Sequence, residues 1–314
     1  MVVTIAIPNY RNPEIIEGVY ACAKQEKIEQ KSIEIIIVGD GRGNGIDSSQ
    51  LTQFNFFKGK IRLFNQEQRT GVAGARNKAI EMSNGDVILF IDDDCIPAKD
   101  WVYRMIAMFE SNPQMVGIGG RVLPLPVGNN IINCYYNSVN RLQKPIFNRN
   151  NEIVTIVTAN CGFRLQELKS IGGFDSKIFN CHPMGGEDID LTIRLNKKGY
   201  LLGYNHNAVV YHKYPTSFKS IIRKYFLYGR GMRIICLAHN IDPTTIGQPR
   251  FSLRSVLFYI ITSFKKVKAD FFYFLSKGHT YVESTSFASF DLLGRMAYIL
   301  GYLSKFKACL KKSR

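Results

Sequence analysis

The chain has 314 residues, enough for one or two domains with a large buried core. Hydrophobic residues make up 46% of it and charged residues 21%, which excludes an intrinsically disordered protein. The net charge of +16 is concentrated after residue 212, where 18 Lys and Arg stand against 4 Asp and Glu. The part before it is nearly neutral, so the charge distribution predicts two functional parts.

The seven cysteines are odd in number and have neither metal-finger nor redox spacing, so we expect reduced structural thiols in a cytosolic compartment. The N-terminus, from Met1 to Pro8, lacks a basic leader and is typical of a first strand rather than of a signal peptide. Both features predict a cytoplasmic location.

Strand-like and helix-like segments alternate in the first 120 residues, as a sheet of βαβ units requires. Apolar runs predict strands at residues 2–8, 33–38, 61–65 and 86–91, with an edge strand at 115–118. Capped or periodic runs predict helices at residues 12–24, 71–82 and 98–110. The short connections predict a mostly parallel sheet with helices on both faces.

After residue 150 the pattern changes. We expect strands at residues 153–159, 200–204 and 209–212, and a helix at residues 189–198. Beyond Pro215 the pattern predicts three helices, at residues 218–239, 253–275 and 287–310. The sequence therefore predicts an α/β catalytic domain over 1–215 and a basic, amphipathic helical C-terminal region over 216–314.

Three consecutive carboxylates directly follow the predicted strand 86–91, at Asp92, Asp93 and Asp94. Adjacent like charges repel, so the cluster favours a compensating cation, although such clusters also occur in solvated turns. In open α/β sheets ligands bind at the carboxyl ends of strands, where residues 9–11 and Asp40 are also expected. An aromatic ring, an Asp and a metal-binding carboxylate run predict a nucleotide-diphosphate site there.

Six short motifs follow one another along the chain: Ile7-Pro8-Asn9-Tyr10-Arg11, Val38-Gly39-Asp40-Gly41, Gly71-Val72-Ala73-Gly74-Ala75-Arg76-Asn77, Ile91-Asp92-Asp93-Asp94, Gly172-Gly173-Phe174-Asp175 and Gly186-Glu187-Asp188-Ile189-Asp190-Leu191. Through these residues, the sequence over about 1–240 resembles family 2 glycosyltransferases with the GT-A fold. The resemblance implies a GT-A-type, mostly parallel sheet flanked by helices. It also implies an inverting, metal-dependent transfer of a sugar from a nucleotide-diphosphate donor.

The resemblance assigns roles on the donor side. Tyr10 and Asp40 match positions that contact the base, and Arg76 matches a basic position close to the nucleotide. Asp92 matches the carboxylate nearer the ribose, and Asp94 the one on the metal. The nucleotide-sugar-binding set implied is Pro8, Tyr10, Asp40, Arg76, Asp92 and Asp93.

On the acceptor side, Asp188 matches the catalytic base, and Glu187 is expected to orient the acceptor or to bond to the backbone. His212 matches a histidine that completes the metal shell in some members, so the metal ligands implied are Asp94, Asp92 and His212. The cofactor implied by the resemblance is a divalent metal, and Mn²⁺ and Mg²⁺ are not distinguished because both accept carboxylate and phosphate oxygens. Residues 1–120 would bind the donor and residues 121–215 the acceptor.

Four residues depart from the family pattern. Gly39 stands where an aspartate is usual and Arg42 where a serine is usual, and Asn9 and Arg11 replace the more usual Thr and Asn in a milder change. Simpler structural roles remain open for five of the assigned residues: Tyr10 as a core residue, Asp188 as the N-cap of the helix at 189, Asp40 as a turn residue, Arg76 as an ion-pair partner of Glu81 or of a sheet carboxylate, and His212 as a surface histidine.

The helices expected at 253–275 and 287–310 mix aromatic and aliphatic residues with lysines, and neither has about 18 uninterrupted apolar residues. This composition predicts peripheral binding to an anionic membrane surface, on the inner face of the membrane. The alternative is that the apolar faces pack on the catalytic domain and the lysines face water. Nucleic acid is not expected as a partner, since we find no nucleic-acid motif.

The predicted function is an inverting glycosyltransferase that moves a sugar from a nucleotide-diphosphate donor to a hydroxyl of a saccharide or lipid-linked acceptor. Two alternatives stay open. A sugar nucleotidyltransferase would also use a metal and an α/β nucleotide site, but would release pyrophosphate. A non-catalytic scaffold on a membrane would not depend on Asp188.

Overall fold

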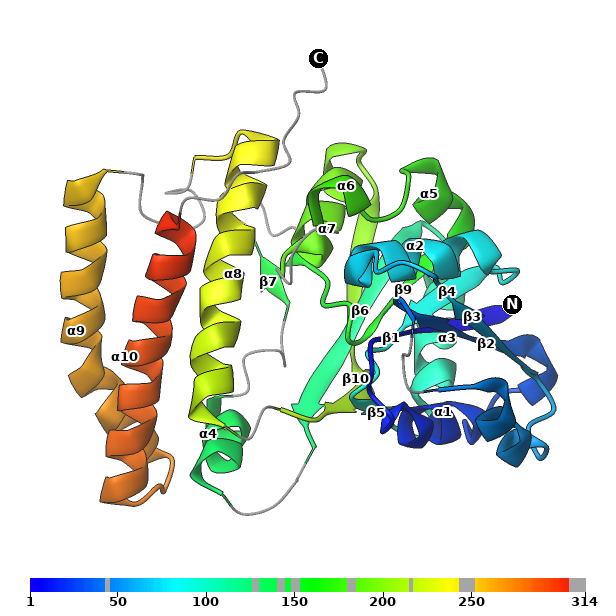
Figure 1. Cartoon of the computed structure of the whole chain (residues 1–314), viewed down its shortest axis with the longest axis horizontal. Coiled ribbons are helices and arrows are strands. Elements are labelled where there is room, and N and C mark those ends of the chain that lie inside the picture. The colour runs from blue at the N-terminus through cyan, green and yellow to red at the C-terminus, as the bar shows by residue number, and fades with distance from the viewer. Residues whose placement is uncertain are drawn as a thin grey trace. The chain divides into compact units, whose positions relative to one another are not determined.

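The computed structural model describes residues 1–42, 46–125, 130–139, 145–147, 153–179, 185–214, 217–242 and 252–304 (Figure 1). The chain forms two compact units. The first contains Met1–Leu125, Asn140–His182 and Glu187–Lys213. The second contains Pro126–Val139, Pro183–Gly186 and Tyr214–Arg314.

An eight-stranded mixed sheet, in the order β3-β2-β1-β4-β9-β6-β10-β5, forms the centre of the first unit. Its strands are β1 (Val3–Asn9), β2 (Ile33–Gly39), β3 (Lys60–Asn65), β4 (Val87–Phe90), β5 (Cys95–Pro97), β6 (Met115–Pro124), β9 (Cys161–Arg164) and β10 (Leu201–His212). The four strands from β3 to β4 are parallel, as is the pair β6–β10. Strands β9 and β5 run antiparallel to their neighbours. The α/β class and the parallel N-terminal half are confirmed.

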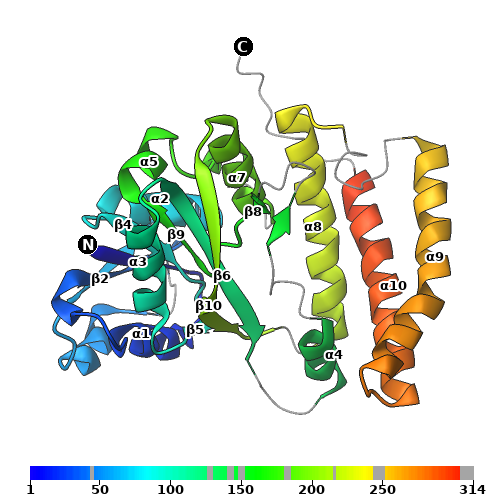
Figure 2. The ribbon, with the colours of Figure 1, turned by 180° about the vertical axis from the view of Figure 1, so that it is seen from behind.

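Helices cover both faces of this sheet. They are α1 (Ile15–Ala23), α2 (Gly71–Met82), α3 (Trp101–Ser111), α5 (Leu165–Ser170), α6 (Ser176–Phe179) and α7 (Glu187–Lys197), with short 3₁₀ turns η1 (Gln30–Ser32) and η2 (Ser48–Phe54). Helices α1 and α3 lie on one face of the sheet (Figure 2). Successive strand residues point to opposite faces, so Ile5, Ile35 and Leu89 pack with these helices in one core. Helix α2 packs on the same strands from the other side.

A strand is present at residues 115–118 as expected, but it is not an edge strand. Strand β6 is longer and lies between β9 and β10. Its glycines hide the strand pattern, but they leave room for side chains of the neighbouring strands: a Cβ on Gly117 would lie 2.8 Å from the ring of Phe163, and one on Gly120 would lie 2.4 Å from Asn160.

Two other boundaries differ from expectation. The strands expected at 200–204 and 209–212 are one strand, β10, whose register with β6 shifts between Asn205 and Val209. Of the strand expected at 153–159, only β8 (Ile153–Thr155) is extended, and it pairs with β7 (Ile146–Phe147) in a separate two-stranded sheet.

The second unit is helical, with α4 (Ile131–Val139), α8 (Phe218–His239), α9 (Leu253–Ser276) and α10 (Tyr281–Leu303). Helix α10 lies between α8 and α9 (Figure 1). Glycines allow it to approach α8, because a Cβ on Gly229 would lie 1.9 Å from the carbonyl oxygen of Tyr298. The helix expected at 287–310 begins earlier, where Thr280 and Glu283 form a capping box. Its expected end at 310 lies outside the described residues.

None of the helices in the described ranges combines the length and the apolarity that crossing a membrane requires.

Candidate active site

Three loops of the first unit meet at the carboxyl ends of the adjacent parallel strands β1, β2 and β4. The backbone N–H of Asp40 donates to the carbonyl oxygen of Asn9 at 2.8 Å, and that of Tyr10 donates to Oδ2 of Asp93 at 3.2 Å. The structure therefore brings Tyr10, Asp40 and the carboxylate run Asp92–Asp94 to one edge of the sheet. Pro8 is buried inside β1, opposite Val38.

Asp40 anchors the start of α2. Its Oδ1 accepts a hydrogen bond from the N–H of Thr70 at 2.6 Å, and its Oδ2 accepts one from the N–H of Gly71 at 3.0 Å. These are amides that the helix itself cannot pair, and the Asp40 side chain supplies their acceptor although it precedes the helix by thirty residues. Asp40 is 4% exposed, so its carboxylate is held firmly against the start of α2.

A cation that the sequence analysis missed joins this group. The guanidinium carbon of Arg69 lies 4.1 Å from the ring centroid of Tyr10, and its Nε lies 3.8 Å from Oδ2 of Asp40. Tyr10 is 41% exposed, so ring and cation together form an accessible surface of the kind that stacks on a base and attracts an anion. The position of Arg69, just before the Gly71–Asn77 motif in the loop after β3, was the available signal.

Arg76 links the carboxylate run Asp92–Asp94 to the start of α7. Its side chain is 2% exposed, and Nη2 donates to Oδ1 of Asp92 at 2.8 Å while Nη1 donates to Oε1 of Glu187 at 2.8 Å. Burial lowers the pKa of Arg76, but the Asp92 and Glu187 carboxylates outweigh it and raise that pKa above its usual range. Of the simpler partners considered, Glu81 instead pairs with Lys78.

The middle carboxylate of the run, Asp93, lies in an environment that disfavours its charged form. Burial, followed by the neighbouring Asp94 charge, raises the pKa of Asp93 to about 7. Its hydrogen bond from the Tyr10 amide opposes this rise, as does one from Asn12, whose Nδ2 also donates to the Asp93 carbonyl oxygen at 2.9 Å. A cation bound beside the run would relieve the repulsion.

Asp94 and His212 offer a place for that cation. Strand β5 pairs with β10 so that Cys95 lies opposite His212, and this brings Nε2 of His212 to 3.5 Å from Oδ1 of Asp94. Ligand atoms of Asp94, Cys95 and His212 all lie within 4.8 Å of one another. Burial raises the pKa of Cys95 well above its usual range, so the soft thiolate is not formed at neutral pH. The remaining carboxylate and imidazole suit Mn²⁺, and the carboxylate alone suits Mg²⁺.

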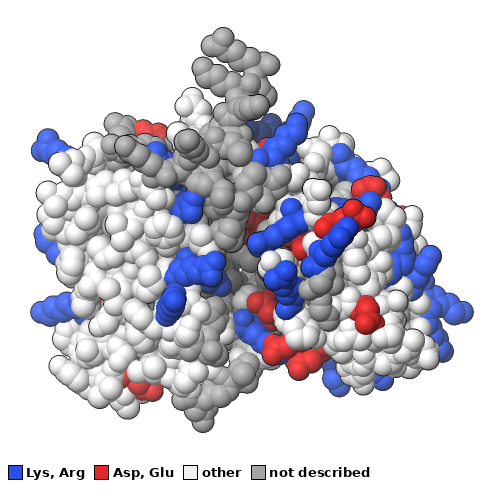
Figure 3. Space-filling model, viewed as in Figure 1, with Lys and Arg blue, Asp and Glu red and all other residues white. Residues whose placement is uncertain are grey.

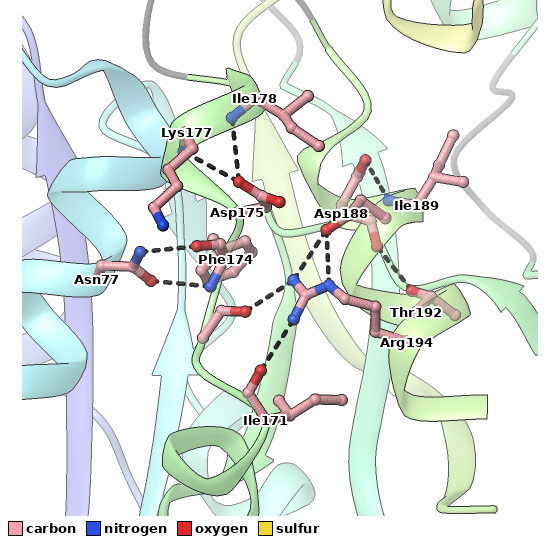
Figure 4. Close-up of polar contacts among 12 residues, drawn as sticks. Asn77, Ile171, Phe174, Asp175, Lys177, Ile178, Asp188, Ile189, Thr192 and Arg194 are labelled. Atoms are coloured by element: carbon pink, nitrogen blue, oxygen red, sulfur yellow. Dashed lines mark hydrogen bonds and ion pairs between the residues drawn. The ribbon is translucent and has the colours of Figure 1, made fainter. Parts of the chain in front are cut away.

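Asp188 lies in the first turn of α7, which begins at Glu187. The helix therefore starts two residues before the expected Ile189, and the interpretation of Asp188 as its N-cap is wrong. Oδ1 of Asp188 accepts from the N–H of Ile189 at 2.8 Å, and its carbonyl oxygen accepts from the hydroxyl of Thr192 at 2.8 Å (Figure 4). Burial, and then the Glu187 charge, raise the pKa of Asp188 to about 7.

Helix α7 is held in place by contacts on both sides. Arg194 donates to the carbonyl oxygens of Ile171 and Gly173, at 3.2 and 2.7 Å, and pairs with the buried Asp190. Asn77 of α2 exchanges two 2.8 Å hydrogen bonds with the backbone of Phe174 (Figure 4). The Gly172–Asp175 motif thus ties the helix that carries Asp188 to the helix that carries Arg76.

The two carboxylate oxygens of Glu187 differ in their hydrogen bonding. Oε1 binds Arg76, whereas Oε2 is buried and has no hydrogen-bond partner within the part of the chain that the structure describes. A buried acceptor of this kind is costly unless a donor reaches it. A hydroxyl group of a bound ligand is one such donor.

Comparison with known proteins agrees with this geometry. The sequence model of Glycosyl transferase family 2 matches residues 4–172. The glycosyltransferase AglE of Haloferax volcanii is 25% identical over 73% of this chain and 72% of that protein. The glucosyl-dolichyl phosphate glucuronosyltransferase of the same organism is 26% identical over 76% of this chain and 78% of that protein.

Two solved structures share the fold. The mannosyltransferase PcManGT from Pyrobaculum calidifontis, in complex with GDP-Man and Mn²⁺, has a TM-score of 0.60 at 14% identity, covering 95% of this chain and 87% of that one. S. aureus TarS 1–349, in complex with UDP, has a TM-score of 0.53 at 18% identity, covering 76% of this chain and 65% of that one.

Replacing Arg76 by Ala is expected to lower the free energy of unfolding by about 3–5 kcal/mol, because it leaves two carboxylates without their buried cation. Urea denaturation measures this. Arg76→Ala combined with Glu187→Gln should lose less than the sum of the single changes, since one stranded charge is gone. The control is Arg42→Ala, whose exposed pair with Glu67 spans 4.0 Å, and it should leave stability unchanged. Equal stability of Arg76→Ala and Arg42→Ala would contradict a structural role for the buried pairs.

Proposed function

Because the chain belongs to glycosyl transferase family 2 and is a glycosyltransferase, we propose that it transfers a sugar from a nucleotide-diphosphate donor to an acceptor hydroxyl with inversion, with a metal bound at Asp94 and with Asp188 as general base. The observation that most supports the proposal is that Arg76 forms two ion pairs, one with Asp92 and one with Glu187. Through one guanidinium, the carboxylate run of the donor side and the helix of Asp188 are held in a single buried network.

On the donor side, we assign the base and ribose to the surface around Tyr10, Asp40 and Arg69. The loops after β1, β2 and β3 hold these residues, and two proteins of the same fold bind UDP and GDP-Man. Arg69 adds a positive charge that attracts a nucleotide diphosphate. Residues 1–120 would accordingly bind the donor and residues 121–215 the acceptor.

Asp94 and His212, with Asp92 beside them, would hold a divalent metal. A bound Mn²⁺ or Mg²⁺ would stabilise the charge that develops on the leaving diphosphate. Asp92 also keeps its ion pair with Arg76, so it is oriented whether or not it contributes an oxygen to the metal. The Mn²⁺ in the PcManGT structure supports a metal of this kind.

Asp188 would act on the acceptor. Its carboxylate accepts the proton of the attacking hydroxyl while the oxygen forms a bond to the anomeric carbon, and the bond from that carbon to the diphosphate breaks on the opposite side. Such a single displacement inverts the anomeric centre and needs only one carboxylate. The burial that raises the pKa of Asp188 also makes it a stronger base. The open Oε2 of Glu187 would accept from another acceptor hydroxyl.

The acceptor class we propose is a saccharide or a lipid-linked molecule, because a relative at 26% identity is named for a glucosyl-dolichyl phosphate substrate. A lipid-linked acceptor would place the enzyme at the inner surface of the membrane. Membership of the glycosyltransferase family argues against the nucleotidyltransferase and scaffold alternatives.

A thermal-shift screen of UDP-, GDP- and dTDP-sugars tests the donor site. With Mn²⁺ present, one base class should raise the melting temperature, since saturation at about 100 times Kd adds roughly 2.7 kcal/mol to stability. Asp94→Asn should reduce the metal-dependent part of the shift, whereas Glu110→Gln, an exposed carboxylate on α3, should not. No shift with any sugar nucleotide, on folded protein, would count against the donor assignment.

Asp188→Asn tests the base. The variant should transfer sugar about 10²–10⁴-fold more slowly, because the amide cannot take the proton, while its thermal shift with donor and metal stays unchanged. Asp175→Asn serves as the control. Asp175 caps α6, and its isosteric replacement by Asn should keep activity. Release of free nucleoside diphosphate measures the reaction. Full activity in Asp188→Asn would remove Asp188 from the mechanism.

The pH profile checks the same assignment. A base must be deprotonated, so a pKa of about 7 makes turnover rise with pH, by about tenfold between pH 6 and 8. Because Asp93 has a similar pKa, Asp93→Asn is the matched variant, and it should retain the rise. A flat profile above pH 5.5 would show that Asp188 titrates as an ordinary carboxyl or is not the base.

A further inference from the structure

Helix α9 has a fixed rotation about its own axis. Val256, Ser263 and Phe274 are buried on one side of it. On the same side Asp270, the only acidic residue of the helix, pairs with Arg295 of α10, and Nη1 of Arg295 reaches the carbonyl oxygen of Ser263 at 3.5 Å. These contacts determine which side of α9 faces away from α10.

The side turned away from α10 is strongly apolar. Seven large hydrophobic residues are exposed there: Leu253 (87%), Leu257 (54%), Phe258 (69%), Ile261 (46%), Phe264 (56%), Phe272 (53%) and Leu275 (38%). At 100° per residue they occupy one side of a helix that is about 36 Å long. A contiguous apolar surface of this kind marks an interaction site.

The same side carries only positive charge. Arg254, Lys265 and Lys268 are exposed among the apolar residues, and Lys266 lies next to them. Figure 3 shows the surface over α9, at the left, as largely uncharged with Lys and Arg along its outer edge. An exposed aromatic and aliphatic side with interspersed cations is the pattern of a helix that lies flat in a membrane interface.

Helix α10 does not share this property. The sequence analysis expected both C-terminal helices to bind the membrane, but α10 packs against α8 and α9 and buries Phe287, Ala288, Ala297 and Tyr302. The apolar character of α10 is thus largely used inside the second unit. Tyr281, Val282, Leu293 and Leu300 of α10 stay exposed, but α9 has the larger set of exposed aliphatic and aromatic side chains.

We propose that the exposed side of α9 docks on an anionic lipid bilayer, with the phenylalanines in the interface and the cations at the headgroups. The proposal rests on the proposed function, since docking would bring the enzyme to a lipid-linked acceptor. A second copy of the chain fits the surface less well. A twofold pairing would set the cations of one α9 against those of the other, and lysines are depleted from the cores of protein interfaces.

Co-sedimentation of the full chain with vesicles tests the proposal. The chain should sediment with vesicles of phosphatidylcholine and phosphatidylglycerol, much less with phosphatidylcholine alone, and less in 0.5 M salt. Phe258→Ser with Phe264→Ser should weaken vesicle binding about tenfold or more, because the variant loses two rings that would be buried in the bilayer interface. Tyr20→Ser with Tyr103→Ser removes two exposed rings from the first unit and is the matched control, expected to bind like the parent.

A second pair of variants tests the contribution of the positive charges to vesicle binding. Lys265→Gln with Lys268→Gln should reduce the preference for anionic vesicles, whereas Lys31→Gln with Lys58→Gln, two exposed lysines of the first unit, should not. Absence of vesicle binding by the parent, or unchanged binding by the α9 phenylalanine variant, would overturn the proposal. So would a dimer in light scattering that the phenylalanine variant converts to a monomer.

Donor binding separates this inference from the proposed function. The α9 variants should keep the parent's melting temperature and its shift with sugar nucleotide and metal, because they change exposed side chains only. A chain that binds its donor but not vesicles would sink the α9 proposal alone. A chain that binds vesicles but no sugar nucleotide would leave the α9 proposal standing and sink the proposed function.

Discussion

The buried guanidinium of Arg76 is the interaction on which the rest of the site depends. A charge that is 2% exposed is tolerable only because carboxylates neutralise it on two sides, and those carboxylates come from the end of β4 and from the start of α7. The same pairs orient Asp92 and Glu187, so one cation sets the positions of a carboxylate after β4 and of a carboxylate on α7. Its loss would leave two partly buried anions repelling each other.

The carboxylate run shows why such compensation is needed. Asp92 is satisfied by Arg76, whereas Asp93 and Asp94 share a crowded loop in which burial and mutual repulsion raise the pKa of Asp93. His212 reaches Asp94 because β10 pairs antiparallel with β5, the strand that directly follows Asp94. A divalent metal bound between these groups would therefore offset the repulsion among the carboxylates of the loop.

The second unit follows a different physical logic. Its helices approach one another through glycines and bury an aromatic cluster, and Tyr135 donates a 2.6 Å hydrogen bond to the buried Asp291 of α10. This packing uses the apolar surface of α10 but leaves one whole side of α9 in water. The unpaired side, rather than the overall positive charge of this part of the chain, indicates where a membrane would bind.

Local sequence alone determined the elements with a strong periodic or apolar pattern. Helices α2 and α8 have the predicted bounds. The apolar runs of β1 and β2 and the polar residues that follow them were recognisable without knowledge of their neighbours in the sheet. Tertiary structure alone decided that β6 lies inside the sheet, because its glycines suit the bulk of adjacent strands and give no strand pattern. It also decided the partners of Arg76, which lie 16 and 111 residues away, and the place of Arg69 over Tyr10. Periodicity reports which side of an element is apolar, but ion pairs between distant residues arise only when the folded chain brings the charges together.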